Sequence, residues 1–81
     1  MEIQIKIIGC GERKTGIAKN GRPYDFVNCH FTYADKYTNG KACGSFMCPG
    51  ERFEQYGVCP GVTLNAIVFF KNYAPDKVYI L

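Results

Sequence analysis

Several residue types that build catalytic sites are scarce or missing in this chain. It has no tryptophan and one histidine, His30, and the adjacent Cys29 would point to the opposite face of a strand. The acidic residues show no spacing that pairs two carboxylates. The short glycine motif Gly9-Cys10-Gly11 lacks the third glycine and the following helix of a nucleotide fingerprint. No catalytic residue, cofactor or small-molecule substrate is indicated, so the sequence predicts that the protein is not an enzyme.

Long apolar runs are also absent, and the cysteines are odd in number. No apolar stretch approaches the length of a membrane span, so no membrane partner is expected. The first 14 residues are too polar and too regularly alternating for a signal peptide. Five cysteines fit poorly with a closed set of disulfides. These features predict free thiols in a reducing, cytoplasmic compartment.

A zinc site is an alternative use for the thiols, and its candidate ligands are Cys29, His30, Cys43, Cys48 and Cys59. Zinc requires four ligands that converge in a tetrahedron. The spacing between Cys43 and Cys48 lies just outside the commonest ligand loop, and no second close pair exists. Free cysteine buried as a small apolar side chain explains the pattern better. No metal ligands are therefore predicted.

Length and composition favour one small domain that spans residues 1–81. A chain of this length buries only somewhat more than about 60% of the surface that its unfolded form exposes, so its core is modest. The net charge of +3 is mildly basic, and it supports a polyanionic partner only if the cations are grouped. Six phenylalanines and six tyrosines exceed what a small core usually needs, so several rings are expected on the surface.

Alternating hydrophobicity predicts an all-β chain. The expected strands cover residues 2–8, 13–18, 24–34, 41–47, 62–71 and 77–81, and a short helix covers 51–56 and ends at Gly57. Glycines at positions 9 and 11 are expected to end the first strand, and residues 72–76 are expected to form the last hairpin tip. The side chains predicted to face the core are Ile3, Ile5, Ile7, Val27, Cys29, Phe31, Tyr33, Val62, Leu64, Ala66, Val68 and Phe70.

Five or six short strands with regular turn signals and one helical turn are typical of a small antiparallel barrel. An oligonucleotide-binding (OB) barrel has this set of elements. An SH3-like barrel is the main alternative. The predicted fold is therefore an OB-like barrel of five to six strands.

The stretch that the rest of the chain is organised around is residues 15–24, TGIAKNGRPY. Asn20-Gly21 predicts a type I′ hairpin turn, in which both central residues have φ > 0. Lys19 and Arg22 flank the turn, and Pro23 precedes Tyr24. Cations that face phosphates and rings that stack on bases are typical of proteins that bind single strands. The basic and aromatic set comprises Arg13, Lys14, Lys19, Arg22, Tyr24, Phe26, Tyr33, Lys71, Tyr73 and Lys77.

This stretch resembles the DNA-binding loop of the filamentous-phage gene V type single-stranded DNA-binding proteins. That family shows a glycine, three residues, a polar residue, and then Gly-Lys/Arg-Pro-Tyr, which residues 16–24 match. The entry into the fifth strand at residues 56–62 and the closing strand–hairpin–strand are similar in pattern. Residues 35–59 depart from the family.

The resemblance implies an OB-type barrel that works as a two-fold dimer and coats single strands cooperatively. The residues that it places on nucleic acid, together with the basic neighbours of the loop, are Lys14, Lys19, Arg22, Tyr24, Phe26, Tyr33, Tyr73 and Lys77. Ile67 and Phe69, expected to point outward from their strand, would form the dimer interface together with Tyr73.

The sequence therefore predicts a protein that binds single-stranded DNA with little sequence preference. Its service in replication or transfer of a phage or mobile element follows from the resemblance alone, and DNA versus RNA is left open. The alternative is a small β-barrel that docks another protein through Ile67, Phe69 and Tyr73 and binds no nucleic acid. In a still plainer interpretation, the cations are solvated surface and the rings are core.

Overall fold

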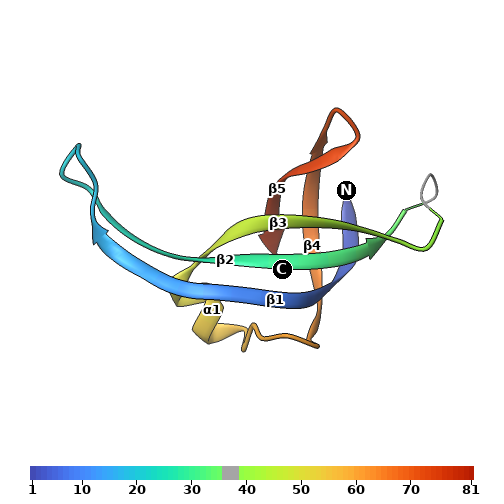
Figure 1. Cartoon of the computed structure of the whole chain (residues 1–81), viewed down its shortest axis with the longest axis horizontal. Helices are drawn as coiled ribbons and strands as arrows, with labels where there is room; N and C mark the ends of the chain where they lie inside the picture. Colours follow the sequence, from blue (N-terminus) through green and yellow to red (C-terminus); the bar gives the residue numbers. More distant parts are fainter. Residues whose placement is uncertain (36–38) are drawn as a thin grey trace.

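The computed structural model describes residues 1–35 and 39–81, and within them the chain is all-β with one short helix. Five antiparallel strands form one sheet in the order β3-β2-β1-β4-β5 (Figure 1). The elements are β1 (Glu2–Ile17), β2 (Pro23–Ala34), β3 (Lys41–Pro49), α1 (Gly50–Gln55), β4 (Thr63–Lys71) and β5 (Ala74–Ile80). The longest dimension is 43 Å, because the β1–β2 hairpin projects far from the rest.

β1 is one long strand, so the expected break at residues 9–11 is wrong. The register with β2 shifts between Ile7 and Gly9 and again between Cys10 and Arg13. Glycine inside a strand often marks such a bulge rather than an end, and a bulge bends the strand and increases its twist. Residues 2–6 of β1 pair with β4, and residues 6–17 pair with β2. β1 therefore links both halves of the sheet while it bends between them.

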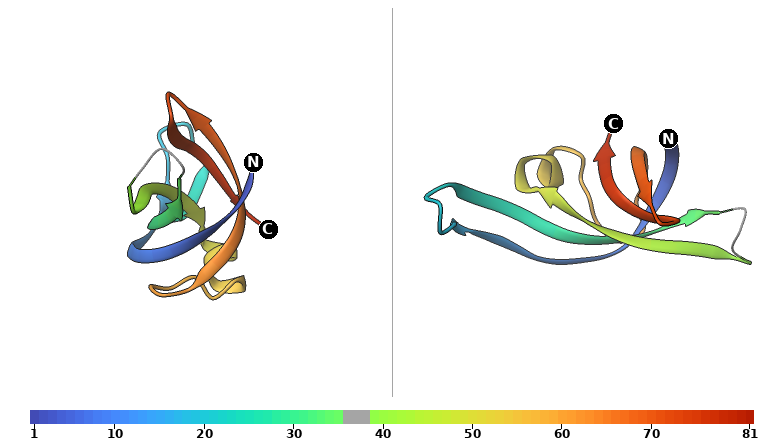
Figure 2. Two further views of the ribbon diagram at one scale, coloured as in Figure 1. Left: turned by 90° about the vertical axis from the view of Figure 1, so that its right-hand side faces the viewer. Right: turned by 90° about the horizontal axis from the view of Figure 1, so that it is seen from above.

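The core lies on one face of the bent sheet, and the expected alternation of β2 is confirmed. Val27, Cys29 and Phe31 are fully buried, and Tyr33 is nearly so. The other buried apolar side chains are Ile5, Ile7, Cys48, Val58, Ala66, Val68 and Ile80. β4, β5 and α1 lie on the same side of the β1-β2-β3 layer (Figure 2, right), which leaves the opposite face of this layer uncovered.

The sheet curls but is not closed into a barrel, so an OB-like barrel is not confirmed. In the described residues β3 and β5 are the two edges of the sheet, without a ladder between them. They approach through side chains instead: a Cβ built on Gly44 would lie 3.0 Å from Cγ of Pro75. Proline has no N–H to donate to a ladder, which is why a strand that contains it suits an edge.

Helix α1 forms close to where it was expected, at Gly50–Gln55 rather than residues 51–56. Gly57 has φ +60°, and its N–H donates to the Glu54 carbonyl at 3.2 Å. The Val58 N–H donates to the Phe53 carbonyl at 3.1 Å, which completes a Schellman cap. Val58 is buried, so the cap also seals this end of the core. The expected role of Gly57 is thus confirmed.

Two hairpin turns differ from their expected types. At the β1–β2 tip the Gly21 N–H donates to the Ala18 carbonyl at 2.9 Å, and Gly21 alone among residues 19–21 has positive φ. This is a three-residue loop with a left-handed glycine rather than a type I′ turn. The two-residue turn with both φ positive lies instead at Asn72 and Tyr73, so the last hairpin is tighter than the predicted tip at 72–76. Asn39-Gly40 is a further turn signal of the sequence, and Gly40 before β3 has φ +95°.

Candidate nucleic-acid interface

The β1–β2 hairpin forms a projecting arm, which we define as residues 13–27. β3 pairs with β2 only as far as Phe26 opposite Pro49, so the arm beyond that point is a two-stranded ribbon. Every residue from 11 to 24 is exposed. Figures 1 and 2 show the arm curving away from the remainder of the fold. Its backbone is therefore accessible from both faces near the tip.

One face of the arm, which we call the outer face, combines a cation with two aromatic rings. Lys14 lies directly opposite Phe26, and Gly16 lies directly opposite Tyr24. Residues opposite each other in an antiparallel pair share a face of the sheet. These four residues therefore lie together on the side that is turned away from the core residue Val27.

The two rings of the outer face form a continuous apolar surface. The ring centroids of Tyr24 and Phe26 are 5.9 Å apart, with their planes at 45°. Tyr24 is 42% exposed, and Phe26 is half-buried. The Tyr24 ring lies across Gly16, where a built Cβ would be 2.6 Å from the phenol oxygen. The ring thus rests on the neighbouring strand with one side open to solvent.

Three cations flank these rings along β1 and at the tip. Lys19 and Arg22 lie at the exposed tip, and Lys14 lies beside Phe26. Within residues 1–35 and 39–81, no carboxylate forms an ion pair with any of the three. The Arg22 backbone N–H donates to Oδ1 of Asn20 at 3.0 Å, which orders the loop that carries both tip cations. The outer face therefore offers positive charge and a ring surface together.

Arg13 does not belong to this set of available cations. Its Nε and a terminal nitrogen donate to the two carboxylate oxygens of Asp25 at 2.8 and 2.6 Å, and its other terminal nitrogen donates to Glu54. The Arg13 guanidinium holds the pKa of the Asp25 carboxyl below its ordinary value. Two carboxylates neutralise the Arg13 charge, so this member of the basic and aromatic set is not a free cation.

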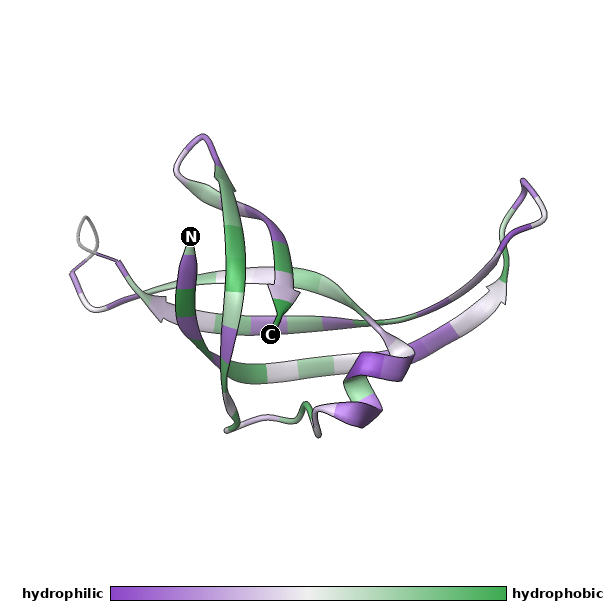
Figure 3. Cartoon of the chain, turned by 180° about the vertical axis from the view of Figure 1, so that it is seen from behind, coloured by the Kyte–Doolittle hydropathy of each residue, from purple (hydrophilic) through white to green (hydrophobic). Residues whose placement is uncertain are grey.

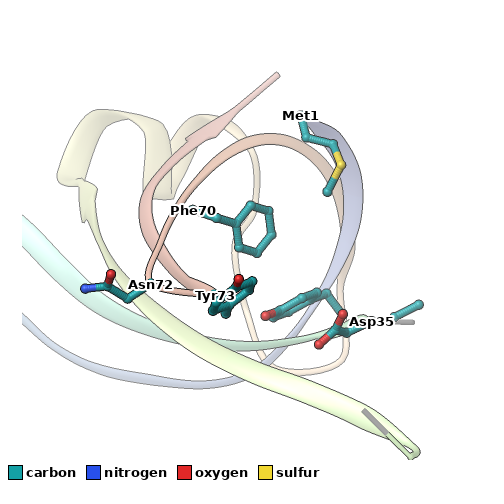
Figure 4. A pocket seen from close by; sticks show the side chains of 7 residues that line it. Met1, Asp35, Phe70, Asn72 and Tyr73 are labelled. Carbon is teal, nitrogen blue, oxygen red and sulfur yellow. The ribbon is translucent and has the colours of Figure 1, made fainter. Parts of the chain in front are cut away.

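Tyr33 and Tyr73 lie away from the arm, and both line an apolar hollow. Tyr33 is only 6% exposed, its ring lies 5.8 Å from that of Phe70, and burial raises the pKa of its phenol. Tyr73 is 92% exposed at the β4–β5 tip. The hollow of about 830 Å³ is open and is lined by Met1, Tyr33, Ala34, Asp35, Phe70, Asn72 and Tyr73 (Figure 4). The predicted nucleic-acid residues thus do not form one continuous surface.

Of the three residues expected at a dimer interface, Ile67 and Phe69 lie on a separate face of β4 and β5, whereas Tyr73 lies at the hairpin tip beside the hollow. Phe69 is 53% exposed and packs edge-on against Tyr79, with centroids 6.0 Å apart. Ile67 is half-buried opposite Tyr79, and Lys77 is exposed opposite Phe69. Figure 3 shows the apolar colour along much of β4. A register shift after Phe69 leaves Phe70, expected to face the core, 38% exposed beside the hollow.

The thiols of Cys10, Cys29 and Cys48 are neighbours on the core face of β1, β2 and β3. Cys10 lies directly opposite Cys29, and Cys48 lies next along the core face, whereas Cys43 and Cys59 are exposed. Burial, together with the neighbouring Cys10 and Cys48 thiols, raises the pKa of Cys29 to about 12. Among the described residues, no group of three or more His, Cys, Asp or Glu side chains is arranged to hold a metal ion.

Sequence reasoning did not identify the roles of Gly16 and Asp25. Gly16 has no side chain and so leaves the space in which the Tyr24 ring lies, and Asp25 binds Arg13. The alternation of β2 already separates Asp25 from Tyr24 and Phe26, and this signal was available. The alternation of residues 13–18 likewise separates Arg13 from Lys14, and only the contact of Arg13 with Glu54 on α1 needed the tertiary structure.

Comparison with protein-family models, curated proteins and solved structures finds no match. In the described part of the chain, no helix has the length and apolar character needed to cross a membrane. The likeness to the gene V type proteins therefore rests on the residues of the sequence itself.

Proposed function

We propose that this protein binds single-stranded DNA with little sequence preference through the outer face and tip of the arm. The observation that carries the proposal is the exposed Tyr24–Phe26 ring pair, flanked by Lys14, Lys19 and Arg22, whose charges no described carboxylate neutralises. Cationic grooves combined with stacking rings bind single strands regardless of sequence, because every base has a flat face.

Binding would proceed by electrostatic capture followed by stacking. Lys19 and Arg22 at the tip meet phosphates first, and releasing the counterions of those phosphates makes the affinity depend on salt. An unpaired base then lies on the open side of Tyr24, which contributes roughly 1–3 kcal/mol. Duplex DNA presents its bases only at their edges, so it cannot use the ring. Coating of single strands during phage or mobile-element replication is the role that the gene V resemblance suggests.

The apolar patch of exposed Phe69 and Tyr79 with half-buried Ile67 suits a second copy of this chain, which would place two arms in one particle. The same observation favours a second candidate function, a docking module that uses this patch and Tyr73 for another protein and ignores nucleic acid. The two candidates use different surfaces, so variants of the arm separate them.

The test is a titration of fluorescent oligo-dT and of a matched duplex over a series of salt concentrations. We expect single-strand binding that weakens with salt. In the variant Lys19→Glu with Arg22→Glu, the slope of log K against log salt should become shallower by about 1.4, since each phosphate contact to a single strand contributes about 0.7. The control is Lys6→Glu with Lys41→Glu, which changes the net charge equally at exposed positions outside the arm and outside the basic and aromatic set. An unchanged slope in the arm variant would contradict the proposal.

A further inference from the structure

Resting on the proposed function, we infer that Arg13 is a positioning residue that sets the angle of the arm, and that it does not contact phosphate. Arg13 and Lys14 are adjacent cations at the base of the arm, and both belong to the basic and aromatic set of the sequence. The structure separates their roles.

The two side chains lie on opposite faces of β1. Arg13 lies opposite Val27, which is fully buried, and Lys14 lies opposite Phe26 on the outer face. A single strand of DNA that runs along the Tyr24 and Phe26 rings passes Lys14. The backbone of the arm then lies between this DNA strand and Arg13. The geometry therefore directs only one of the two cations toward the proposed ligand.

Arg13 joins three elements at the base of the arm. Its guanidinium meets both carboxylate oxygens of Asp25 on β2, at 2.8 and 2.6 Å, and also Glu54 on α1. This two-point fork needs the planar guanidinium, because a lysine ammonium cannot offer parallel N–H groups. The result is a bridge from β1 through β2 to the helix.

Gly50 completes the junction. A Cβ at position 50 would lie 2.3 and 2.4 Å from the two carboxylate oxygens of Asp25, so only glycine lets α1 approach the carboxylate this closely. Gly50 is also buried, whereas Arg13 and Asp25 are partly exposed. The carboxylate of Asp25 is thus held between the guanidinium and the first residue of the helix.

The bridge lies at the base of the arm, where it can fix the direction in which the arm projects. Arg13 follows the bulge at which β1 leaves the core, and β3 ends its pairing with β2 at Phe26. A two-stranded ribbon is only marginally stable by itself, so contacts at its base are needed to hold its orientation. Partly exposed ion pairs add little to global stability. Loss of the Arg13 ion pairs should therefore change the direction of the arm more than the stability of the fold.

The first test compares Arg13→Lys with Lys14→Gln by oligo-dT titration over a salt series. Lysine keeps the charge but loses the fork. We expect Arg13→Lys to bind roughly 3- to 10-fold more weakly at every salt concentration with an unchanged slope, because an unfixed arm must be ordered on binding. Lys14→Gln should instead make the slope shallower by about 0.7. Wild-type affinity in Arg13→Lys would overturn the inference.

For Asp25→Asn, the two possible roles of Arg13 predict opposite changes in DNA affinity. If Arg13 contacted phosphate, freeing it from Asp25 would strengthen DNA binding, whereas loss of the bridge should weaken binding. Glu51→Gln is the matched control, because it removes one negative charge from α1 without touching the bridge. Stronger binding in Asp25→Asn than in Glu51→Gln would refute the positioning role.

Hydrogen exchange separates this inference from the proposed function. In protein without DNA, the amides of residues 13–27 should exchange faster in Arg13→Lys and Asp25→Asn than in the wild type, while those of β4 stay unchanged. Unchanged exchange in the arm would overturn the bridge. If the wild type fails to bind oligo-dT, the proposed function fails, and the exchange experiment still decides whether Arg13 holds the arm.

Discussion

The ring of Tyr24 lies directly over Gly16 of the neighbouring strand, and this contact leaves no space for a side chain at position 16. A Cβ there would lie 2.6 Å from the phenol oxygen and 2.8 Å from Cζ of the ring. A glycine opposite an aromatic residue lets the ring lie flat across the backbone, which occupies one side of the ring and leaves the other open.

Gly16→Ala should therefore displace Tyr24 and weaken oligo-dT binding. The loss should approach the contribution of one stacked base, roughly 1–3 kcal/mol. Tyr24→Ala should cost about the same, and the double variant should bind no more weakly than Tyr24→Ala alone, because both changes remove one interaction. Fluorescence titration at low salt measures all three.

Gly11→Ala is the control for the position 16 experiment. Its built Cβ lies 3.6 Å from the Asn28 carbonyl oxygen, an ordinary contact, so binding should remain near the wild-type value. Full affinity in Gly16→Ala would show that the orientation of Tyr24 does not matter for binding.

Tyr73 occupies a backbone conformation that favours glycine, with φ +65°. That region costs a residue with a Cβ roughly 1–2 kcal/mol, and the greater freedom of glycine in the unfolded chain offsets part of the gain from replacing it. Tyr73→Gly should raise the free energy of unfolding by about 0.5–1 kcal/mol in urea denaturation.

Asn72→Gly provides the comparison for Tyr73, since asparagine tolerates positive φ better than tyrosine and should give a smaller gain. Strain at an exposed ring suggests that the ring serves a contact outside its own chain. Tyr73→Gly should then weaken self-association or DNA binding while it stabilises the fold. A drop in stability would instead point to a supporting contact within the chain.

Phe69→Lys should reduce self-association. Phe69 is exposed and packs on Tyr79, so lysine there places a charge in the centre of the apolar patch at little cost to the fold. Analytical ultracentrifugation should find dimers in the wild type and monomers in the variant. Met47→Lys changes a still more exposed apolar residue on β3 and should remain dimeric. Identical behaviour of all three proteins would exclude the patch as a subunit interface.

Cys29 makes stability depend on pH in the alkaline range. Its pKa is raised to about 12 in the fold by burial and by the Cys10 and Cys48 thiols, against about 8.5 in an unfolded chain. Because the pKa is raised on folding, the stabilisation is fully present at pH values below the pKa of the unfolded chain. It is lost as the pH rises toward the pKa of the folded protein. The free energy of unfolding should therefore fall from about pH 8.5 upward.

The comparison for this experiment is the slope of unfolding free energy against pH in Cys29→Ala, which should be flatter than in the wild type. Alkylation of the native protein gives a further check, because Cys43 and Cys59 are exposed and should react long before Cys29 and Cys48. Rapid reaction of Cys29 at neutral pH would show that the core does not protect it.

Features with local causes were predictable from the sequence. Polar and apolar residues alternate along residues 27–33, so the buried face of β2 follows from the pleat of a strand. Gly57 ends α1 because a left-handed residue satisfies the last carbonyls of a helix, and glycine takes that conformation at least cost. The hairpin around Asn20 and Gly21 places Lys19, Arg22 and Tyr24 together because few residues separate them.

Features that depend on strand pairing needed the tertiary structure. Glycines 9 and 11 suit either a strand end or a bulge, and only pairing of β1 with both β2 and β4 decides for the bulge. The register of residues 13–17 with 23–27 is continuous from the hairpin tip, so the hairpin itself places Arg13 with Asp25 and Lys14 with Phe26. The contact of Arg13 with Glu54 and the close approach of Gly50 to Asp25 depend on where α1 packs against the arm, and no local propensity encodes that position.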